Sequence, residues 1–449
     1  MHALSHTIAR PRRSRATLLA LALLLALPVA SAADAVTDWN AIASGPVVGP
    51  RFGGPYQQFR AMAIVQIAVH DALNSIDRRY DPYSAVSPVP AGASANAAVA
   101  AAARDTLLGL LASTPDGEAK TAAIDLVNTS YANALAAIPN GTAKTQGIAA
   151  GSAASAAILL ARTNDGSSTP HTPAYSAAPG PGVYQPTPAP IDPGPVQFSG
   201  WSATKTFVVP SATYFRVAPA EIFDLAGARY ASEYNQVKHI GDARVRGTAL
   251  NSQQSDIARF WAGGGLDWNA NARLILEGFH LDMWGNARAL ALMTVSIADA
   301  TINNAESKYW YAFWRPVTAI RWANDGNPQT QSDPAWRPFI QTPPYPDYPC
   351  NSTSATGGAT TALRLALGTN NAPFTRTVNA PPLAMPEPIP TAPGKAITRT
   401  YASLTHAAGE VARSRVYAGI HFYEGCKAGL DQGDKAARYI YAHAFRPAD

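Results

Sequence analysis

The segment Lys308-Tyr-Trp-Tyr-Ala-Phe-Trp-Arg315-Pro316 combines two cations with a cluster of aromatic residues. Lys308 and Arg315 are seven residues apart, which is two helical turns, so a helix would place them on nearly the same face. Pro316 is then expected to stop or bend that helix. Two neighbouring cations repel each other unless negative charge lies between them. The segment therefore predicts either a bound anion or a carboxylate partner such as Asp299 or Glu306.

Helical periodicity recurs on both sides of this segment, and no other regular pattern competes with it. The expected helices cover residues 60–76, 94–113, 118–137, 143–162, 219–240, 252–261, 269–284, 287–314, 359–367, 396–413 and 427–443. Two Pro-rich segments, 163–201 and 371–393, interrupt them, and the first is a surface excursion or a lid. We expect a mainly α fold of packed helical bundles with two long Pro-rich loops.

A second notable segment is Pro343-Pro-Tyr-Pro-Asp-Tyr-Pro-Cys-Asn-Ser-Thr-Ser-Ala-Thr-Gly-Gly-Ala359. A rigid approach leads through small polar residues into a helix. The free backbone N–H groups and the positive dipole end of such a helix suit a phosphate-like oxyanion. Many helices begin with a polar cap and bind nothing, so this segment alone leaves both readings open.

The third segment is Ser414-Arg415-Val-Tyr-Ala-Gly-Ile-His421-Phe-Tyr-Glu-Gly-Cys426. Arg415 and His421 are six residues apart and cannot share one face of a straight helix. If the two side chains converge, the backbone must turn between them, and Gly419 is the expected place. By itself an Arg and a His in this spacing more often have a structural role than a functional one.

Together the three segments resemble the vanadium-dependent haloperoxidase and type 2 phosphatidic-acid-phosphatase superfamily. Its pattern is Lys-x6-Arg-Pro, then Pro-Ser-Gly-His, then Ser-Arg-x5-His-x3-Asp. Residues 62–75, 257–261 and 313–320 also read like its secreted haloperoxidase-like branch, so the resemblance spans most of the chain after residue 32. It implies bundled helices with an oxyanion pocket between them.

The resemblance also implies roles for particular residues. Lys308, Arg315 and Arg415 would hold the equatorial oxygens of vanadate or phosphate, and His421 would be the vanadate ligand or the phosphatase nucleophile. Asn351 and Ser352, at the middle motif, would complete the cofactor-binding set. Cations around the equator and an imidazole at one apex suit both reactions, because vanadate mimics a phosphoryl transition state.

The middle motif departs from the family pattern, because Pro-Ser-Gly-His is replaced by Pro349-Cys350-Asn351-Ser352. The missing histidine handles protons in the family, and such general acid–base help is worth about 10² to 10⁴ in rate. The aspartate expected four residues after His421 is also absent, since that position is Gly425. Both proton handling and the orientation of the His421 imidazole are therefore expected to be altered.

Four residues are candidates to take over the lost roles by their proximity in sequence, and each could equally be a surface or structural residue. They are Asp347, Glu424, His406 and His443. The pair His70-Asp71 lies in an early predicted helix, where a satisfied interior pair is the expected role.

The two cysteines, Cys350 and Cys426, belong to the second and third segments. If both segments border one pocket, the thiols should be close, and an exported protein would meet oxidising conditions. We expect a Cys350–Cys426 disulfide, with two free buried thiols as the alternative.

The N-terminal 32 residues explain the basic charge of the chain. Four arginines and no acid precede an apolar run from Ala16 to Ala30 and the small-residue site Ala30-Ser31-Ala32, which is the pattern of a secretory signal peptide. The whole chain has 35 Lys+Arg and 30 Asp+Glu, so cleavage would leave 31 (35 minus 4) against 30. We expect a periplasmic or secreted helical domain over 33–449, with no nucleic-acid partner and no stable membrane anchor.

Three functions remain open at this point. The favoured one is a secreted vanadate-dependent haloperoxidase-like enzyme that uses hydrogen peroxide to oxidise halide or an organic substrate, with altered proton handling. The second is a phosphatase of the same superfamily that acts on a phosphomonoester without a cofactor. The third is a non-catalytic oxyanion-binding protein. No motif indicates haem, flavin or zinc, and the oligomeric state is not encoded in any pattern.

Overall fold

The computed structural model describes residues 34–187, 194–385 and 389–448. Residues Ala35–Asp449 form one compact unit, to which the fold and site below belong. The predicted signal peptide lies outside the described residues. No helix within the described ranges is long and apolar enough to cross a membrane.

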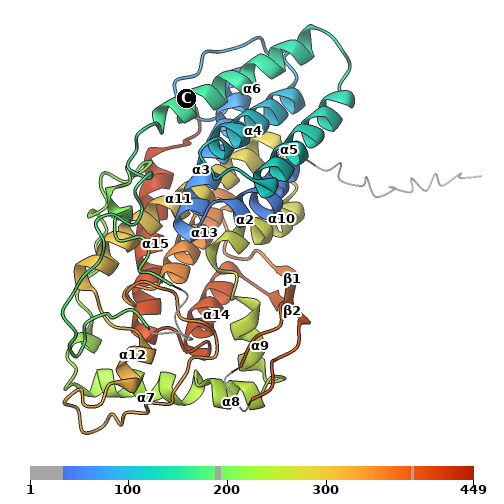
Figure 1. The fold of residues 1–449 in the computed structure, drawn as a ribbon. Coiled ribbons are helices and arrows are strands. Elements are labelled where there is room, and N and C mark those ends of the chain that lie inside the picture. The colour runs from blue at the N-terminus through green and yellow to red at the C-terminus, as the bar shows by residue number, and fades with distance from the viewer. Residues whose placement is uncertain (1–33, 188–193, 386–388, 449) are drawn as a thin grey trace, which may run out of the picture. The chain divides into compact units, whose positions relative to one another are not determined.

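The N-terminal part of this unit is a bundle of four helices that pack on one another (Figure 1). They are α3 (Pro55–Ile76), α4 (Ala95–Leu111), α5 (Glu118–Ala136) and α6 (Thr142–Ala161). The apolar face of α3 extends around nearly its whole circumference, so almost every residue from Phe59 to Ile76 is buried. A helix that is apolar on all sides belongs in a protein interior. The short segments α1 (Ala35–Ile42), η1 (Ala43–Val48) and α2 (Gly49–Arg51) precede this bundle.

The C-terminal part is a second bundle built around α11 (Met283–Tyr311), α13 (Asn351–Leu367), α14 (Leu404–Tyr417) and α15 (Tyr423–His443). Helix α11 also packs against α3, so it belongs to both bundles. Its burial is almost continuous from Asn286 to Lys308. Asp282 caps its start, where the carboxylate accepts a hydrogen bond from the Gly285 backbone N–H at 2.9 Å.

Shorter elements connect and cover the bundles. They are η2 (Trp201–Ala203), η3 (Glu221–Phe223), α7 (Ala228–Ile240), α8 (Ala243–Thr248), α9 (Gln253–Phe260), η4 (Gly264–Asp267), α10 (Trp268–Phe279) and α12 (Pro316–Arg321). The predicted mainly α fold is confirmed. The helix predicted over 219–240 is shorter than expected, because its first residues form the 3₁₀ turn η3 and a loop instead.

The helix predicted over 396–413 is wrong in its first half. Residues 395–401 form strand β2 (Lys395–Tyr401), which pairs antiparallel with β1 (Phe374–Ala380). The register pairs Phe374 with Tyr401 and Ala380 with Lys395. Exposed and more buried positions alternate along both strands, and the four threonines all face outward. One of the two predicted loops therefore contains a hairpin strand.

Candidate functional site

Lys308 lies near the end of α11 with its side chain fully buried. Its Nζ donates hydrogen bonds to the backbone carbonyls of Pro346 and Asp347, at 2.8 and 2.9 Å. Asp299 and Glu306, the two carboxylates that the sequence offered as partners of Lys308, bind other groups. Asp299 accepts three hydrogen bonds from the backbone of residues 207–209, and Glu306 pairs with Arg216. The structure thus gives neither of these acids to Lys308.

The sequence predicted that Arg315 and Lys308 lie on one face of a helix. This prediction is wrong, because Arg315 lies beyond the end of α11. Helix α11 ends at Tyr311, and Ala312 adopts a left-handed conformation with φ 43°. Residues 182–184 then pair with residues 312–314, through Trp314 N–H to the Gly182 carbonyl and Tyr184 N–H to the Ala312 carbonyl. Pro316 consequently starts helix α12 rather than ending α11, because its fixed φ suits a first helical position.

The Arg315 guanidinium is fully buried and reaches the same region as Lys308 from this extended segment. Its Nε donates to the Tyr345 carbonyl at 2.7 Å, and Nη1 donates to the Ile420 carbonyl at 2.8 Å. Both cations also lie over the Tyr345 ring, with Arg315 Cζ and Lys308 Nζ at 5.1 and 5.2 Å from its centroid. Nη2 has no hydrogen-bond partner among the described residues.

Arg415 enters the site from α14. Its Nη2 donates to the Trp261 carbonyl at 2.8 Å, and Nη1 donates to Ser352 Oγ at 3.3 Å. Burial lowers the pKa of its guanidinium. The helix ends two residues later, and Gly419 turns the chain with φ 76°. Since a Cβ on Gly419 would lie 2.4 Å from the Gly241 carbonyl oxygen, the expected turning point is confirmed and only glycine fits it.

His421 follows this turn and is buried beside Arg315. Its Nε2 lies 2.9 Å from Arg315 Nη1, and its Nδ1 lies 2.8 Å from Asp347 Oδ1. The geometry of the Asp347 contact falls outside that of a hydrogen bond, and neither carboxylate oxygen has a hydrogen-bond partner among the described residues. Arg315 Nη1 also lies 3.4 Å from Nδ1. A carboxylate this close to Nδ1 favours the tautomer that has the proton on Nδ1 and the lone pair on Nε2.

The N-terminus of α13 points its free backbone donors into the same cluster. The helix begins at Asn351, eight residues before the predicted start, so Asn351 and Ser352 occupy its first turn. Asn351 Oδ1 is buried without a hydrogen-bond partner among the described residues. The helix start also contributes partial positive charge, which favours an anion.

The predicted disulfide is not present, since Cys350 and Cys426 are both free and fully buried. The two side chains nevertheless lie in the same small buried cluster. Burial opposes ionisation of the Cys350 thiol, but the neighbouring Cys426, His421 and Lys308 side chains lower its pKa. Burial raises the pKa of the Cys426 thiol.

The other residues considered for the lost roles have different partners. Glu424 accepts a hydrogen bond from the Glu221 backbone N–H, and His443 contacts the Tyr439 carbonyl. His406 lies beside the Tyr401 ring. His70 and Asp71 form an interior contact of 3.0 Å within α3, and Asp71 also accepts from the backbone of residues 83 and 84. Of the candidates, only Asp347 contacts His421.

The electrostatics of the cluster favour an anion. Burial, followed by the charge of Arg315, lowers the pKa of Lys308 to about 7. Three basic side chains converge here, and Asp347 is the carboxylate that faces them, with its Oδ1 3.8 Å from Arg315 Nη1. Buried charges are costly unless they are compensated. The orphaned Arg315 Nη2 and the free helix start therefore fit an oxyanion such as vanadate or phosphate.

Two residues that the motif pattern did not indicate help to position the site. Tyr345 supplies the carbonyl and ring that hold Arg315, and Trp261 supplies the carbonyl that holds Arg415. Both lie in segments that the sequence analysis had singled out. Their roles depend on backbone carbonyls, which no residue type encodes.

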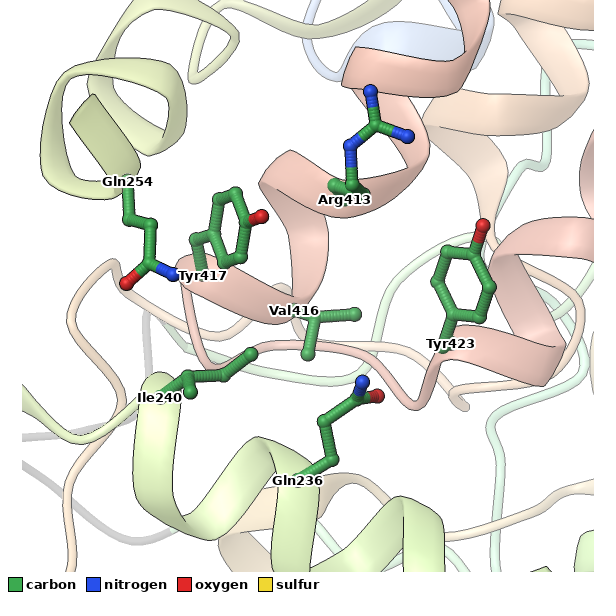
Figure 2. Close-up of a pocket in the computed structure, with 7 residues that line it drawn as sticks. All are labelled: Gln236, Ile240, Gln254, Arg413, Val416, Tyr417 and Tyr423. Atoms are coloured by element: carbon green, nitrogen blue, oxygen red, sulfur yellow. The ribbon is translucent and has the colours of Figure 1, made fainter.

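A groove of about 210 Å³ lies on the other side of α14 (Figure 2). Arg413, Val416 and Tyr417 line it from α14, while Arg415 points away from it toward Ser352. Its other lining residues come from α7, α9 and the start of α15: Gln236, Ile240, Gln254 and Tyr423. The helix turn that supplies Arg415 to the site thus also forms a surface groove.

Comparison with known proteins supports the same assignment for the fold. Residues 288–449 match the family model of the VCPO second helical-bundle domain. A bacterial vanadium-dependent iodoperoxidase superposes with a TM-score of 0.72 at 20% identity, covering 92% of this chain and 97% of that one. The holo form of a bacterial vanadium-dependent chloroperoxidase gives 0.70 at 17% identity, covering 90% and 94%.

The apo form of such a chloroperoxidase gives a TM-score of 0.65 at 16% identity, covering 86% of this chain and 92% of that one. A search of curated protein sequences finds no match. The matched model covers α11, α13, α14 and α15, which carry Lys308, Asn351, Arg415 and the segment after His421. Residues 288–449 are therefore similar to the VCPO second helical-bundle domain, and the chain has the fold of the bacterial vanadium-dependent haloperoxidases on which it superposes.

Proposed function

We propose that this protein is an exported, vanadate-dependent, haloperoxidase-like oxidoreductase that uses hydrogen peroxide and handles protons differently from its relatives. The observation that carries the proposal is the convergence of three buried cations, one helix start and His421 Nε2. The iodoperoxidase and chloroperoxidase that share its fold are vanadium-dependent. Peroxide and a halide or small organic molecule would be its substrates.

Each residue of the cluster has a part in this proposal. Lys308, Arg315 and Arg415 would neutralise the oxygens of vanadate, helped by the α13 backbone donors near Asn351 and Ser352. His421 would bind the metal through Nε2, because Nδ1 faces Asp347. When bound, vanadate would polarise peroxide for attack by halide. The protein's own contribution is to hold these charges in place, away from water.

The site has no obvious side chain to donate or accept a proton at the position of the family histidine. Ser352 occupies the position of the family histidine, and its hydroxyl accepts a hydrogen bond from Arg415. A serine hydroxyl is too weak an acid to replace an imidazole. Slow turnover is therefore part of the proposal, and complete loss of this step would leave an oxyanion-binding protein without catalytic activity.

A phosphatase is the second candidate, and the Asp347–His421 contact suits it as well as it suits the oxidoreductase. A nucleophilic imidazole needs the same proton on Nδ1 and lone pair on Nε2 as a metal ligand does. In this case phosphate would occupy the cluster and no cofactor would be needed.

Two assays on the purified protein separate these functions. Halide-dependent consumption of peroxide that appears only after addition of orthovanadate supports the oxidoreductase. Release of phosphate from a phosphomonoester, inhibited by vanadate, supports the phosphatase. Vanadate binding without either activity supports the non-catalytic alternative. His421→Ala serves as the control in both assays and should abolish each signal.

A further inference from the structure

The His421 imidazole has a carboxylate neighbour, although the position that supplies one in the family pattern is Gly425. Asp347 Oδ1 lies 2.8 Å from His421 Nδ1. Both side chains are almost completely buried, Asp347 at 0% and His421 at 2% exposure. The carboxylate comes from the Pro-rich segment before α13, not from the segment that follows the histidine.

Because Gly425 has no side chain, the Asp347 carboxylate can occupy the space next to it. A Cβ on Gly425 would lie 3.2 Å from Asp347 Oδ2, closer than ordinary van der Waals contact. The Cys350 backbone N–H donates to the Gly425 carbonyl at 2.9 Å, so the two segments are directly paired at this point. An aspartate at position 425 would therefore compete with Asp347 for one place.

The backbone of Asp347 is fixed by Lys308, a member of the anion cluster, and by Phe313, which lies two residues before Arg315 in the chain. Its N–H donates to the Phe313 carbonyl at 2.9 Å. Its carbonyl accepts a hydrogen bond from Lys308 Nζ, also at 2.9 Å. Because both the backbone N–H and the backbone carbonyl of Asp347 are hydrogen-bonded, its carboxylate has a fixed origin and can hold the His421 imidazole in one orientation.

We propose that Asp347 is the positioning residue of His421, which replaces the carboxylate missing at position 425 and keeps the lone pair on Nε2. The inference rests on the proposed function only in taking Nε2 as the working nitrogen. It applies equally to a metal ligand and to a phosphatase nucleophile.

A simpler role for Asp347 would be that of a counter-ion for Arg315, whose Nη1 lies 3.8 Å from Oδ1. Lys308 Nζ contacts the Asp347 carbonyl, so its charge also faces this segment. A counter-ion affects charge balance and stability but has no reason to determine which His421 nitrogen carries the proton. The tautomer therefore separates the two roles.

The test is the tautomer of His421, read from the ¹⁵N chemical shifts of the histidine-labelled protein and assigned by comparison with His421→Gln. We expect the Nδ1–H form in the unchanged protein. Asp347→Ala should allow the Nε2–H form to become populated. Asp431→Asn, which changes an exposed acid paired with Lys435, should leave the shifts unchanged.

Gly425→Ala provides a second variant that keeps every charge. Its methyl group crowds Asp347 Oδ2, so we expect the same change of tautomer, and Asp347→Ala/Gly425→Asp should restore the Nδ1–H form. If Asp347→Ala and Gly425→Ala both fold, unchanged His421 shifts in both would overturn the proposal. If only one of them folds, unchanged shifts in that variant would overturn it.

Vanadate affinity gives a separate readout. Loss of a residue that orients a metal ligand typically costs about 10- to 100-fold in affinity, and we expect this for Asp347→Ala. A change of tautomer without any vanadate binding to the unchanged protein would support the role of Asp347 and refute the oxidoreductase. Vanadate binding to the unchanged protein, together with an unchanged tautomer in the variants, would support the proposed vanadate site and refute the role of Asp347.

Discussion

The environment of the Lys308 side chain indicates that the site binds an anion. Its ammonium group is fully buried and its pKa is lowered to about 7, first by burial and then by the charge of Arg315. Two backbone carbonyls satisfy part of the ammonium group, but they carry no full negative charge. A bound oxyanion would supply that charge, so the protonation of Lys308 and the binding of an anion should be linked.

This linkage predicts how stability depends on pH. The pKa of Lys308 is 10.5 in the unfolded chain and about 7 in the folded one. Between these values the unfolded chain binds a proton that the folded chain has released, so stability rises with pH. The unfolding free energy of the wild type relative to Lys308→Met should increase by about 1.4 kcal/mol per pH unit at most, and by a few kcal/mol in total.

Urea unfolding at pH 7, 8, 9 and 10 measures this difference. Lys435→Met, which removes an exposed lysine paired with Asp431, should show no such trend. Saturating phosphate or vanadate should flatten the curve, because the anion keeps Lys308 protonated. A difference independent of pH without anion would contradict the lowered pKa.

Ser352 carries the second prediction at this scale. Glu424, His406 and His443 have partners outside the cluster, so none of them replaces the missing histidine. Ser352→His should therefore raise halide-dependent peroxide consumption in the presence of vanadate, by about 10-fold or more, since general acid–base help is worth about 10² to 10⁴. Ser352→Ala is the matched control and should show no gain. Unchanged or reduced activity in Ser352→His would mean that another group already moves the proton.

The sequence predicted the members of this cluster better than their contacts. Lys308, Arg315, Arg415 and His421 stood out because their residue types and spacing suit an oxyanion. Asp347 was only one of several candidates, because the contact with His421 depends on two segments that are 74 residues apart (421 minus 347). The disulfide could not be decided, since proximity of two cysteines does not determine their oxidation state.

At the scale of elements, the packing of α13 against α15 positions the middle motif. The two helices approach closely enough that their glycines contact backbone on the other helix. A Cβ on Gly433 would lie 2.1 Å from the Ser354 carbonyl oxygen and 2.4 Å from the Gly358 nitrogen. This close approach holds the start of α13, with Asn351 and Ser352, against the segment that carries Cys426.

Gly433→Ala should therefore destabilise the protein although alanine is the better helix former. Overpacking of this kind typically costs about 1 to 3 kcal/mol, and here backbone must move. Gly278→Ala in α10 is the matched control, because a Cβ there has open space, and it should be neutral or stabilising by up to about 1 kcal/mol. Thermal unfolding of both variants measures the difference, and equal melting temperatures would contradict this account of the packing.

Helix existence was predictable for most elements, whereas several boundaries were not. Helices α3 to α6 follow the predicted ranges within a few residues, except for the five extra residues at the start of α3. The end of α11 was missed because it depends on pairing with residues 182–184, which are distant in sequence. Strand β1 was missed because it lies within the predicted Pro-rich loop 371–393, and β2 was missed because helical spacing was preferred to the Thr-rich alternation of 397–400.

At the scale of the chain, the Pro-rich segment 163–201 contributes to the site. Its residues 182–184 pair with 312–314, and the Gln197 backbone N–H donates to the Pro344 carbonyl at 2.9 Å. Phe198 and Trp201 pack around Tyr345, whose carbonyl holds Arg315. The described part of this segment thus supports the backbone on which two of the three cations depend.

Export is the prediction that concerns the N-terminal region. If residues 1–32 are a signal peptide, expression in a bacterium with an intact export pathway should yield a periplasmic or secreted protein that begins at Ala33. N-terminal sequencing of the purified protein checks this. Deleting residues 2–32 should retain the protein in the cytoplasm. An exported protein that still begins at Met1 would contradict the prediction of cleavage.

The central claim is that the buried cluster binds an oxyanion through His421 and the three cations. Equilibrium binding of orthovanadate to the purified protein, with His421→Ala at the same concentration, tests it most directly. We predict saturable binding at one site per chain that His421→Ala abolishes or weakens by at least about 10-fold. Absence of binding to the unchanged protein, or binding that is equal in His421→Ala, would contradict the claim.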